Sequence, residues 1–222
     1  IAKFYLVSEP FKSLKFLKNF LHLPNIAESW MYDNVKGDIK IEELYAEYDL
    51  INNHIIENSI QGKAQIKDAK IRFHKDVDAV NTKSLDIFFK DNRLHFNLME
   101  PMFKDKKLDG SFVLINNLTS EKNGQVDVFL KTNSKLDKDI LDILKAYNIT
   151  LPIIQKNGNT QASLLMKFPY DTTKNMSTYG EFFLNDAKVA INNFEFESKN
   201  AEVILDDSII KIKNSDFKYK DM

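Results

Sequence analysis

Most of the chain alternates apolar and polar residues with a period of two, and one twelve-residue stretch of this pattern occurs twice. GKAQIKDAKIRF begins at Gly62 and GEFFLNDAKVAI begins at Gly180. Gly, Asp, Ala and Lys occupy the same four places in both stretches. Successive side chains of a strand point to opposite faces of a sheet, so this period predicts strands with one apolar face.

The repeated stretch also carries one residue too many for strict alternation. Two apolar positions, one extra residue and three more apolar positions follow Gly62 and Gly180, and the same template follows Gly37. An extra residue would move the later apolar side chains to the other face unless the backbone absorbs it. A β-bulge absorbs one residue in this way, and a short turn is the alternative. We therefore predict a bulge or turn near Asp68 and Asp186.

Further alternating runs are separated by turn signals. LDIFFKDNRLHFNL and AEVILDDSIIKIKN each consist of two alternating halves around a polar triplet, and Asn-Gly dipeptides occur at residues 123–124 and 157–158. Asn-Gly between alternating runs is a strong hairpin signal. The sequence predicts a mainly β fold of roughly a dozen strands in one long antiparallel meander.

Two segments have a helical period instead. Residues 8–21 space Phe11, Leu14, Leu17 and Leu21 three or four apart, and residues 136–149 place Ile140, Leu141, Leu144 and Tyr147 on one stripe. This spacing is typical of amphipathic helices. We expect both helices to cover part of the sheet. The alternative for the first, which carries Lys12, Lys15 and Lys18, is that it lies on a membrane surface. They suggest two modules of a helix followed by strands, residues 1–134 and 135–222, in a segment that continues into a longer protein.

The residues that enzymes, metal sites and nucleic-acid interfaces need are not arranged in a recognisable pattern. The four histidines lack metal-ligand spacing, no glycine-rich phosphate loop occurs, and the chain has no cysteine. The formal net charge is −1, so no strong field attracts nucleic acid. We predict a protein that is not an enzyme, with no metal, no cofactor and no nucleic-acid partner. No run of eighteen apolar residues predicts a membrane span.

A sheet with one apolar face must cover that face. The meander could curl into an open trough whose apolar wall shelters an acyl chain, since each methylene removed from water contributes roughly 0.8 kcal/mol. A closed β-sandwich, in which the apolar face is ordinary core, is the alternative. An enzyme that uses carboxylates on an envelope polymer is a third hypothesis, which no pocket motif supports.

A resemblance favours the trough. LPNIAESWMYDNVKGDIKIEELYAEYDL, the GKAQIKDAKIRF unit, LDGSFVLI, YNITLPIIQKNGNTQASLLMKFPY and the GEFFLNDAKVAI unit together resemble the AsmA-like family of envelope proteins. The likeness is to the C-terminal AsmA-like region of YhdP- and TamB-type members, and it runs from about Leu23 to the end. It implies a repeating β-groove, or β-taco, in a periplasmic segment of a protein anchored in the inner membrane of a diderm (Gram-negative) bacterium.

The same resemblance implies a function in outer-membrane biogenesis. Members are thought to move phospholipid between the inner and outer membranes, which parts outside this segment would contact, and the family offers no catalytic residues. Which lipid, which direction and which oligomeric state are not indicated. The expected lipid-binding wall consists of the alternating apolar positions: Ile39, Ile41, Ile66, Ile71, Phe73, Ile87, Phe89, Leu94, Phe96, Leu114, Val128, Leu130, Leu164, Met166, Phe182, Leu184, Val189, Ile191, Val203, Leu205 and Ile212.

Overall fold

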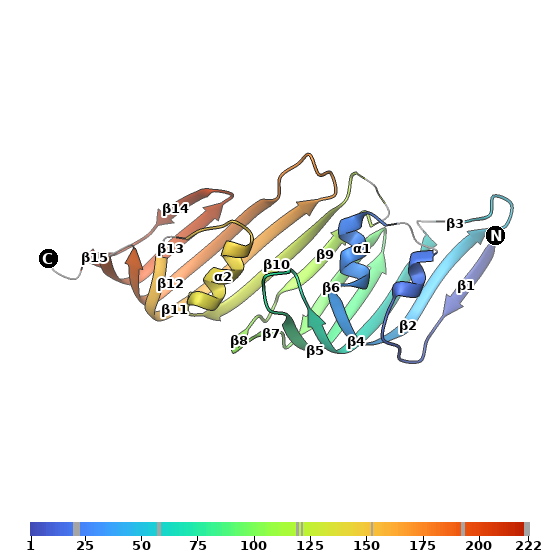
Figure 1. Ribbon diagram of the computed structural model, residues 1–222, viewed down its shortest axis with the longest axis horizontal. Coiled ribbons are helices and arrows are strands. Elements are labelled where there is room, and N and C mark those ends of the chain that lie inside the picture. The colour runs from blue at the N-terminus through green and yellow to red at the C-terminus, as the bar shows by residue number, and fades with distance from the viewer. Residues whose placement is uncertain are drawn as a thin grey trace.

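The described strands form a single open antiparallel sheet, which confirms the predicted mainly β meander (Figure 1). The computed structural model describes residues 1–19, 23–56, 59–118, 120, 122–151, 153–191 and 194–219. Neighbouring strands along the sheet are β1 (Ala2–Leu6), β2 (Val35–Asp49), β4 (Gln61–Ile71), β5 (Val80–Lys90), β6 (Arg93–Met99), β9 (Phe112–Asn116), β10 (Gln125–Ser134), β11 (Ile153–Pro169), β12 (Ser177–Ile191), β13 (Phe194–Asp206) and β14 (Ile209–Lys213).

Four short strands of the described residues pair with members of this sheet but lie outside the main strand order. β3 (His54–Ile55) pairs with β2, β15 (Lys218–Tyr219) pairs with β13, and β7 (Met102–Phe103) joins β5 to β8 (Lys106–Lys107). The described residues therefore make one sheet, not the two packed sheets of a sandwich. The sheet passes without a break from β10 to β11, across the boundary at residues 134 and 135. The division into two modules stays a prediction.

The extra residue of the repeat is absorbed as predicted. Asp68 has a φ of 49° and Asp186 a φ of 45°, so both have left-handed backbone within otherwise extended strands. Ile66 and Ala69 are both buried although their positions differ by three, an odd number, and so are Leu184 and Ala187. The third unit shifts its register between Ile41 and Glu43. Each irregularity returns the following apolar side chains to the same face of the sheet.

The two GxxxxxDAK units also have equivalent partners. In the first unit Gly62 pairs with Phe89 on the next strand, and in the second unit Gly180 pairs with Leu205. Thr82 donates a hydrogen bond of 2.8 Å to the carbonyl oxygen of Ser84, and Ser198 donates one of 2.8 Å to that of Asn200. These hydroxyls lie at matching places, opposite Ala69 and Ala187 respectively. The repetition seen in sequence is therefore a repetition of strand pairing.

The second predicted helix forms where its stripe indicated. α2 (Lys138–Ala146) buries Ile140, Ile143 and Leu144. Asp137 caps its N-terminus by accepting hydrogen bonds from the backbone N–H groups of Asp139 and Ile140, at 3.1 and 3.3 Å. Such a cap satisfies donors that the first helical turn leaves free.

A buried lysine holds this helix end. Lys106 on β8 has a side chain that is 5% exposed, and its Nζ lies 2.8 Å from Oδ2 of Asp137 and 2.7 Å from Oδ1 of Asp105. Burial by itself lowers the pKa of Lys106, but its hydrogen bonds to Asp105 and Asp137 outweigh that effect and raise the pKa. The ammonium group is therefore charged, and it complements the N-cap carboxylate.

The first predicted helix is misplaced. Residues 8–21 were expected to be helical, but the backbone of Phe11 pairs with Ile39 of β2 and only a 3₁₀ turn, η1 (Lys15–Asn19), follows. The N–H group of Phe11 donates to the carbonyl oxygen of Ile39 at 2.8 Å, so an edge pairing takes the donors that a helix would have used. The α-helix of this part is α1 (Asn25–Tyr32). Leu21, part of the expected stripe, lies outside the described residues.

Both helices lie over the same face of the sheet (Figure 1). Trp30 of α1 approaches Phe96 of β6 with 6.4 Å between ring centroids, and Tyr147 after α2 approaches Phe168 of β11 with 5.6 Å. We call the face that carries Phe96 and Phe168 the inner face and the opposite one the outer face. The hydrophobic core of the described residues is one cluster between the inner face and these helices.

Candidate functional site: an apolar pocket on the inner face

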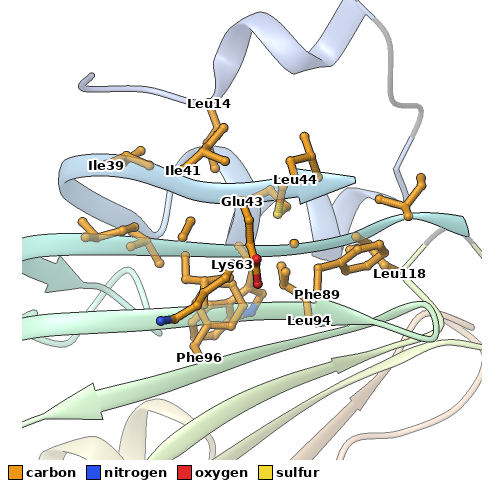
Figure 2. A pocket seen from close by; sticks show the side chains of 18 of the residues that line it. Leu14, Ile39, Ile41, Glu43, Leu44, Lys63, Phe89, Leu94, Phe96 and Leu118 are labelled. Carbon is orange, nitrogen blue, oxygen red and sulfur yellow. The ribbon is translucent and has the colours of Figure 1, made fainter. Parts of the chain in front are cut away.

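A pocket of about 340 Å³ opens on the inner face of the first half of the sheet. Apart from Glu43 and Lys63, the residues around it are apolar (Figure 2). Its volume falls in the range of small-molecule sites, which are commonly lined by apolar side chains. The lining consists of Leu14, Leu23, Trp30, Met31, Val35, Ile39, Ile41, Glu43, Leu44, Ala46, Ile55, Ile60, Gly62, Lys63, Ala64, Ile66, Ile87, Phe89, Leu94, Phe96 and Leu118.

Strand register explains the floor of this pocket. Gly62 pairs with Phe89, which pairs with Leu94, so these three residues form one row across β4, β5 and β6. Ala64 and Ile87 begin the next row, and Phe96 continues it. Directly paired residues of an antiparallel sheet point to the same face, so both rows face the pocket.

The remaining walls come from the segment that precedes β2. Leu14, Leu23, Trp30 and Met31 line the pocket from η1, α1 and the residues around them. Lys15 and Asp33 form an ion pair of 2.9 Å between the two ends of this segment. The pocket therefore lies between the sheet and a separate covering segment.

The two charged residues of the lining belong to the outer face by register. Glu43 pairs with Lys63, and Lys63 pairs with Phe88, a side chain that is 38% exposed on the face opposite Phe89. Nζ of Lys63 lies 5.9 Å from the Phe88 ring centroid and 2.7 Å from Oε2 of Glu42. These charges are thus directed to the outer face, and the pocket offers a ligand an apolar surface.

Seven of the residues expected to form a lipid-binding wall line this pocket. They come from three neighbouring strands and from β2, as the alternation required: Ile39, Ile41, Ile66, Ile87, Phe89, Leu94 and Phe96. Four others border a cavity of only about 10 Å³ next along the sheet: Ile71, Phe73, Val128 and Leu130. Their lipid contact stays a prediction.

Most of the second half of the expected wall is buried. Seven of its side chains are at most 5% exposed, and all belong to β11, β12 or β13: Leu164, Met166, Phe182, Leu184, Val189, Val203 and Leu205. Ile191 is partly buried against the same core. Ile212 pairs with Val203 and so shares the inner face, but it lies on β14 and is 46% exposed.

The placement of Leu114 on this wall is wrong. Leu114 pairs with His95 and with Asp127, and His95 pairs with Phe88, so this row lies on the outer face. Its neighbour Val113 is the inner-face residue, since it pairs with Phe96 and Val128. His95 is half-buried in the same outer row, and burial lowers its pKa.

Sequence reasoning missed the residues that give the pocket its shape. Leu14 belongs to the apolar stripe expected to cover the sheet, whereas Trp30 and Met31 lie on α1, which was not predicted as a helix. Gly62 and Ala64 were recognised as strand residues but not as a floor. Two small residues two positions apart on one face of a strand are the signal that could have indicated an open space.

Other kinds of site have no support among the residues that the structure describes. Within them, no group of three or more His, Asp or Glu side chains could hold a metal ion. Among the described helices, none has the length and apolar character that crossing a membrane requires.

The fold and the pocket define a class of protein: a long one-layer antiparallel sheet whose inner face, under short helices, is largely apolar. The family model described as YhdP protein matches residues 22–221. The chain therefore belongs to the YhdP family, a family of envelope proteins, which agrees with the AsmA-like resemblance of its sequence. The comparison with curated proteins and the comparison with solved structures gave no match.

Proposed function

We propose that this chain is a periplasmic segment of a lipid-transfer protein, in which the inner face shelters acyl chains that pass between the inner and outer membranes. The observation that carries the proposal is the 340 Å³ pocket, whose inner-face lining is apolar. Membership of a family of envelope proteins supports this location for such a ligand.

The energetics favour a hydrocarbon ligand. Transfer of a sixteen-carbon chain from water to an apolar site is favourable by on the order of 12 kcal/mol, at roughly 0.8 kcal/mol for each methylene. The floor and walls supply apolar contacts for part of such a chain, while an ionic or hydroxylated ligand would find few partners to replace its hydration. The phospholipid head group would remain outside, and no catalytic step is part of the proposal.

A structural repeat without a ligand is the second candidate. The packing of Phe182 favours it for the second half of the chain, because the ring lies against the backbone of Gly180 and is only 2% exposed. The two candidates differ in whether the purified protein carries lipid.

The test is to identify what the inner face contacts. The protein is purified without detergent, lipids are extracted, and mass spectrometry determines their identity and stoichiometry. In parallel, a photoreactive phenylalanine analogue replaces Phe89 in one variant and Phe88 in another. We expect bound phospholipid, with cross-links at position 89 and not at position 88. Absence of lipid, or equal cross-linking at both positions, would contradict the proposal.

A further inference from the structure

One inner-face position differs strongly between the two repeated units. Aligned on Gly62 and Gly180, the units place Ala64 where the second has Phe182. The alignment is structural as well, because Asp68 and Asp186 share a positive φ and Ala69 and Ala187 pair with equivalent hydroxyl residues. The partners of these two residues on the preceding strand also differ in size: Ile41 pairs with Ala64, and Ala162 pairs with Phe182.

In the second unit, the Phe182 ring covers the glycine. A β carbon on Gly180 would lie 2.9 Å from Cε2 of Phe182, so the ring lies directly against this backbone. Phe182 is 2% exposed, and Gly180 is buried as well. The small partner Ala162 leaves room for the ring. The aromatic side chain thus fills the inner face of its own repeat.

In the first unit, no ring occupies the equivalent place. The atoms nearest to a β carbon on Gly62 would be the carbonyl oxygen of Glu43 and Cδ1 of Leu44, both at 3.1 Å and both from β2. Gly62 and Ala64 remain partly exposed and line the pocket. The larger partner, Ile41, lies at the side of this floor instead of on it.

We infer that Ala64 is the residue that determines ligand capacity: the pocket is open because this position carries a methyl group, and Phe182 is a built-in plug that closes the equivalent place of the second unit. The inference rests on the proposed function, because the ligand it concerns is an acyl chain. It adds that the side chain at this position decides whether each of the two repeated units of this chain can hold an acyl chain.

The main experiment exchanges the two arrangements. Ile41→Ala/Ala64→Phe gives the first unit the residues that the second has at these two positions, and Ala162→Ile/Phe182→Ala does the reverse. Phe89 and Leu205, the partners of Gly62 and Gly180, stay unchanged in both. Binding of cis-parinaric acid, a fluorescent C18 fatty acid, is titrated for each protein, and thermal unfolding establishes that each is folded. We expect the first exchange to weaken binding at least tenfold and the second to add one further probe molecule per chain. Phe183→Ala, on the outer face and 42% exposed in the native protein, should bind as the unchanged protein does.

A graded series covers the case in which an exchange variant does not fold. Ala64→Val, Ala64→Leu and Ala64→Phe add increasing volume at one position, and the affinity for the probe should fall in that order. Affinity that does not depend on the size of residue 64 in folded variants would overturn the inference while the proposed function stands. If the unchanged protein binds neither the probe nor lipid, the proposed function fails and the inference fails with it.

Discussion

Gly158 of β11 lies so close to the backbone of β12 that a β carbon on it would be 2.4 Å from the carbonyl oxygen of Asp186. Gly158 has a φ of 85° and Asp186 a φ of 45°. The first repeat contains the same relationship, since a β carbon on Gly37 would be 2.7 Å from the carbonyl oxygen of Lys67, next to Asp68. The bulges at Asp68 and Asp186 thus each have a glycine packed closely against them on the preceding strand.

Replacement of Gly158 by alanine tests this close packing. The added methyl group combines an unfavourable φ with a backbone clash, so we expect Gly158→Ala to lower the free energy of unfolding by at least about 2 kcal/mol. Gly110→Ala is the matched control, because Gly110 has a φ of 86° but only an ordinary 3.4 Å contact to the Lys131 side chain. It should cost about 1 kcal/mol. Urea denaturation measures both, and equal losses would show that the clash is relieved without cost.

This relationship also explains what the sequence could predict. Alternation identifies a strand because each side chain reports its own face, and a bulge appears in the pattern as one surplus residue before Ala69 or Ala187. These are local signals. The repeat of Gly, Asp, Ala and Lys therefore predicted strands and bulges correctly, while the glycine opposite each bulge lies on another strand and could not be paired with it from sequence alone.

The errors have equally local causes. Phe112, Val113, Leu114 and Ile115 are all apolar, so alternation does not distinguish the two faces of β9, and only the pairing of Val113 with Val128 does so. The misplaced first helix has a good apolar stripe, but Phe11 pairs with β2 instead. The pocket depends on contacts between α1 and the sheet, for which a single sequence without an alignment contains no signal.

Two buried tyrosines offer a matched test of hydrogen bonding. Tyr147 donates a hydrogen bond of 2.6 Å to the carbonyl oxygen of Phe73, whereas the hydroxyl of Tyr170 is buried with no partner among the described residues. We expect Tyr147→Phe to lower the free energy of unfolding by about 1 kcal/mol, because the carbonyl loses its donor. Tyr170→Phe should be neutral or stabilising, because it removes a buried polar group that has no partner. Equal effects in chemical denaturation would contradict the assignment.

The same tyrosines should affect stability at alkaline pH. Burial raises the pKa of Tyr147 and of Tyr170. Above about pH 10 the unfolded chain releases a proton from each tyrosine and the folded protein does not, so stability falls as the pH rises, by about 1.4 kcal/mol for each unit and each group. Phenylalanine at position 147 has no hydroxyl proton, so the Tyr147→Phe variant does not lose the stability that Tyr147 loses at high pH. The difference in the free energy of unfolding between Tyr147→Phe and the unchanged protein, present at pH 8, should therefore disappear near pH 11. A difference that stays constant with pH would contradict the pKa shift.

The carboxylate of Asp137 contributes to stability in two ways at the N-terminus of α2, and two substitutions distinguish them. Asp137 caps the helix through Oδ1 and pairs with the buried Lys106 through Oδ2. Asp137→Asn keeps a good capping residue but removes the charge, and we expect a loss of about 1.5 kcal/mol, because Asp105 still pairs with Lys106. Asp137→Ala removes the cap too and should cost about 1 kcal/mol more.

Urea denaturation monitored by circular dichroism measures both losses. Lys138→Ala is the control, since Lys138 forms an exposed ion pair with Asp142 on the same helix, and it should change stability by less than about 0.5 kcal/mol. Identical losses for Asp137→Asn and Asp137→Ala would mean that the cap contributes nothing.

Phe89 and Phe88 are consecutive residues that test the two faces of the sheet. Phe89 lines the pocket beside Gly62, and Phe88 points to the outer face near Lys63. An aspartate at position 89 would place a carboxylate in the apolar path but could keep water in an open pocket. We expect Phe89→Asp to melt at nearly the temperature of the unchanged protein and to carry several times less lipid, as measured by mass spectrometry of the extract.

A sealed core would instead lose several kcal/mol on burial of an unpaired charge. Phe88→Asp, the control, should leave both melting temperature and lipid content unchanged. If Phe89→Asp unfolds and the unchanged protein carries no lipid, the pocket is ordinary core and the structural-repeat function stands.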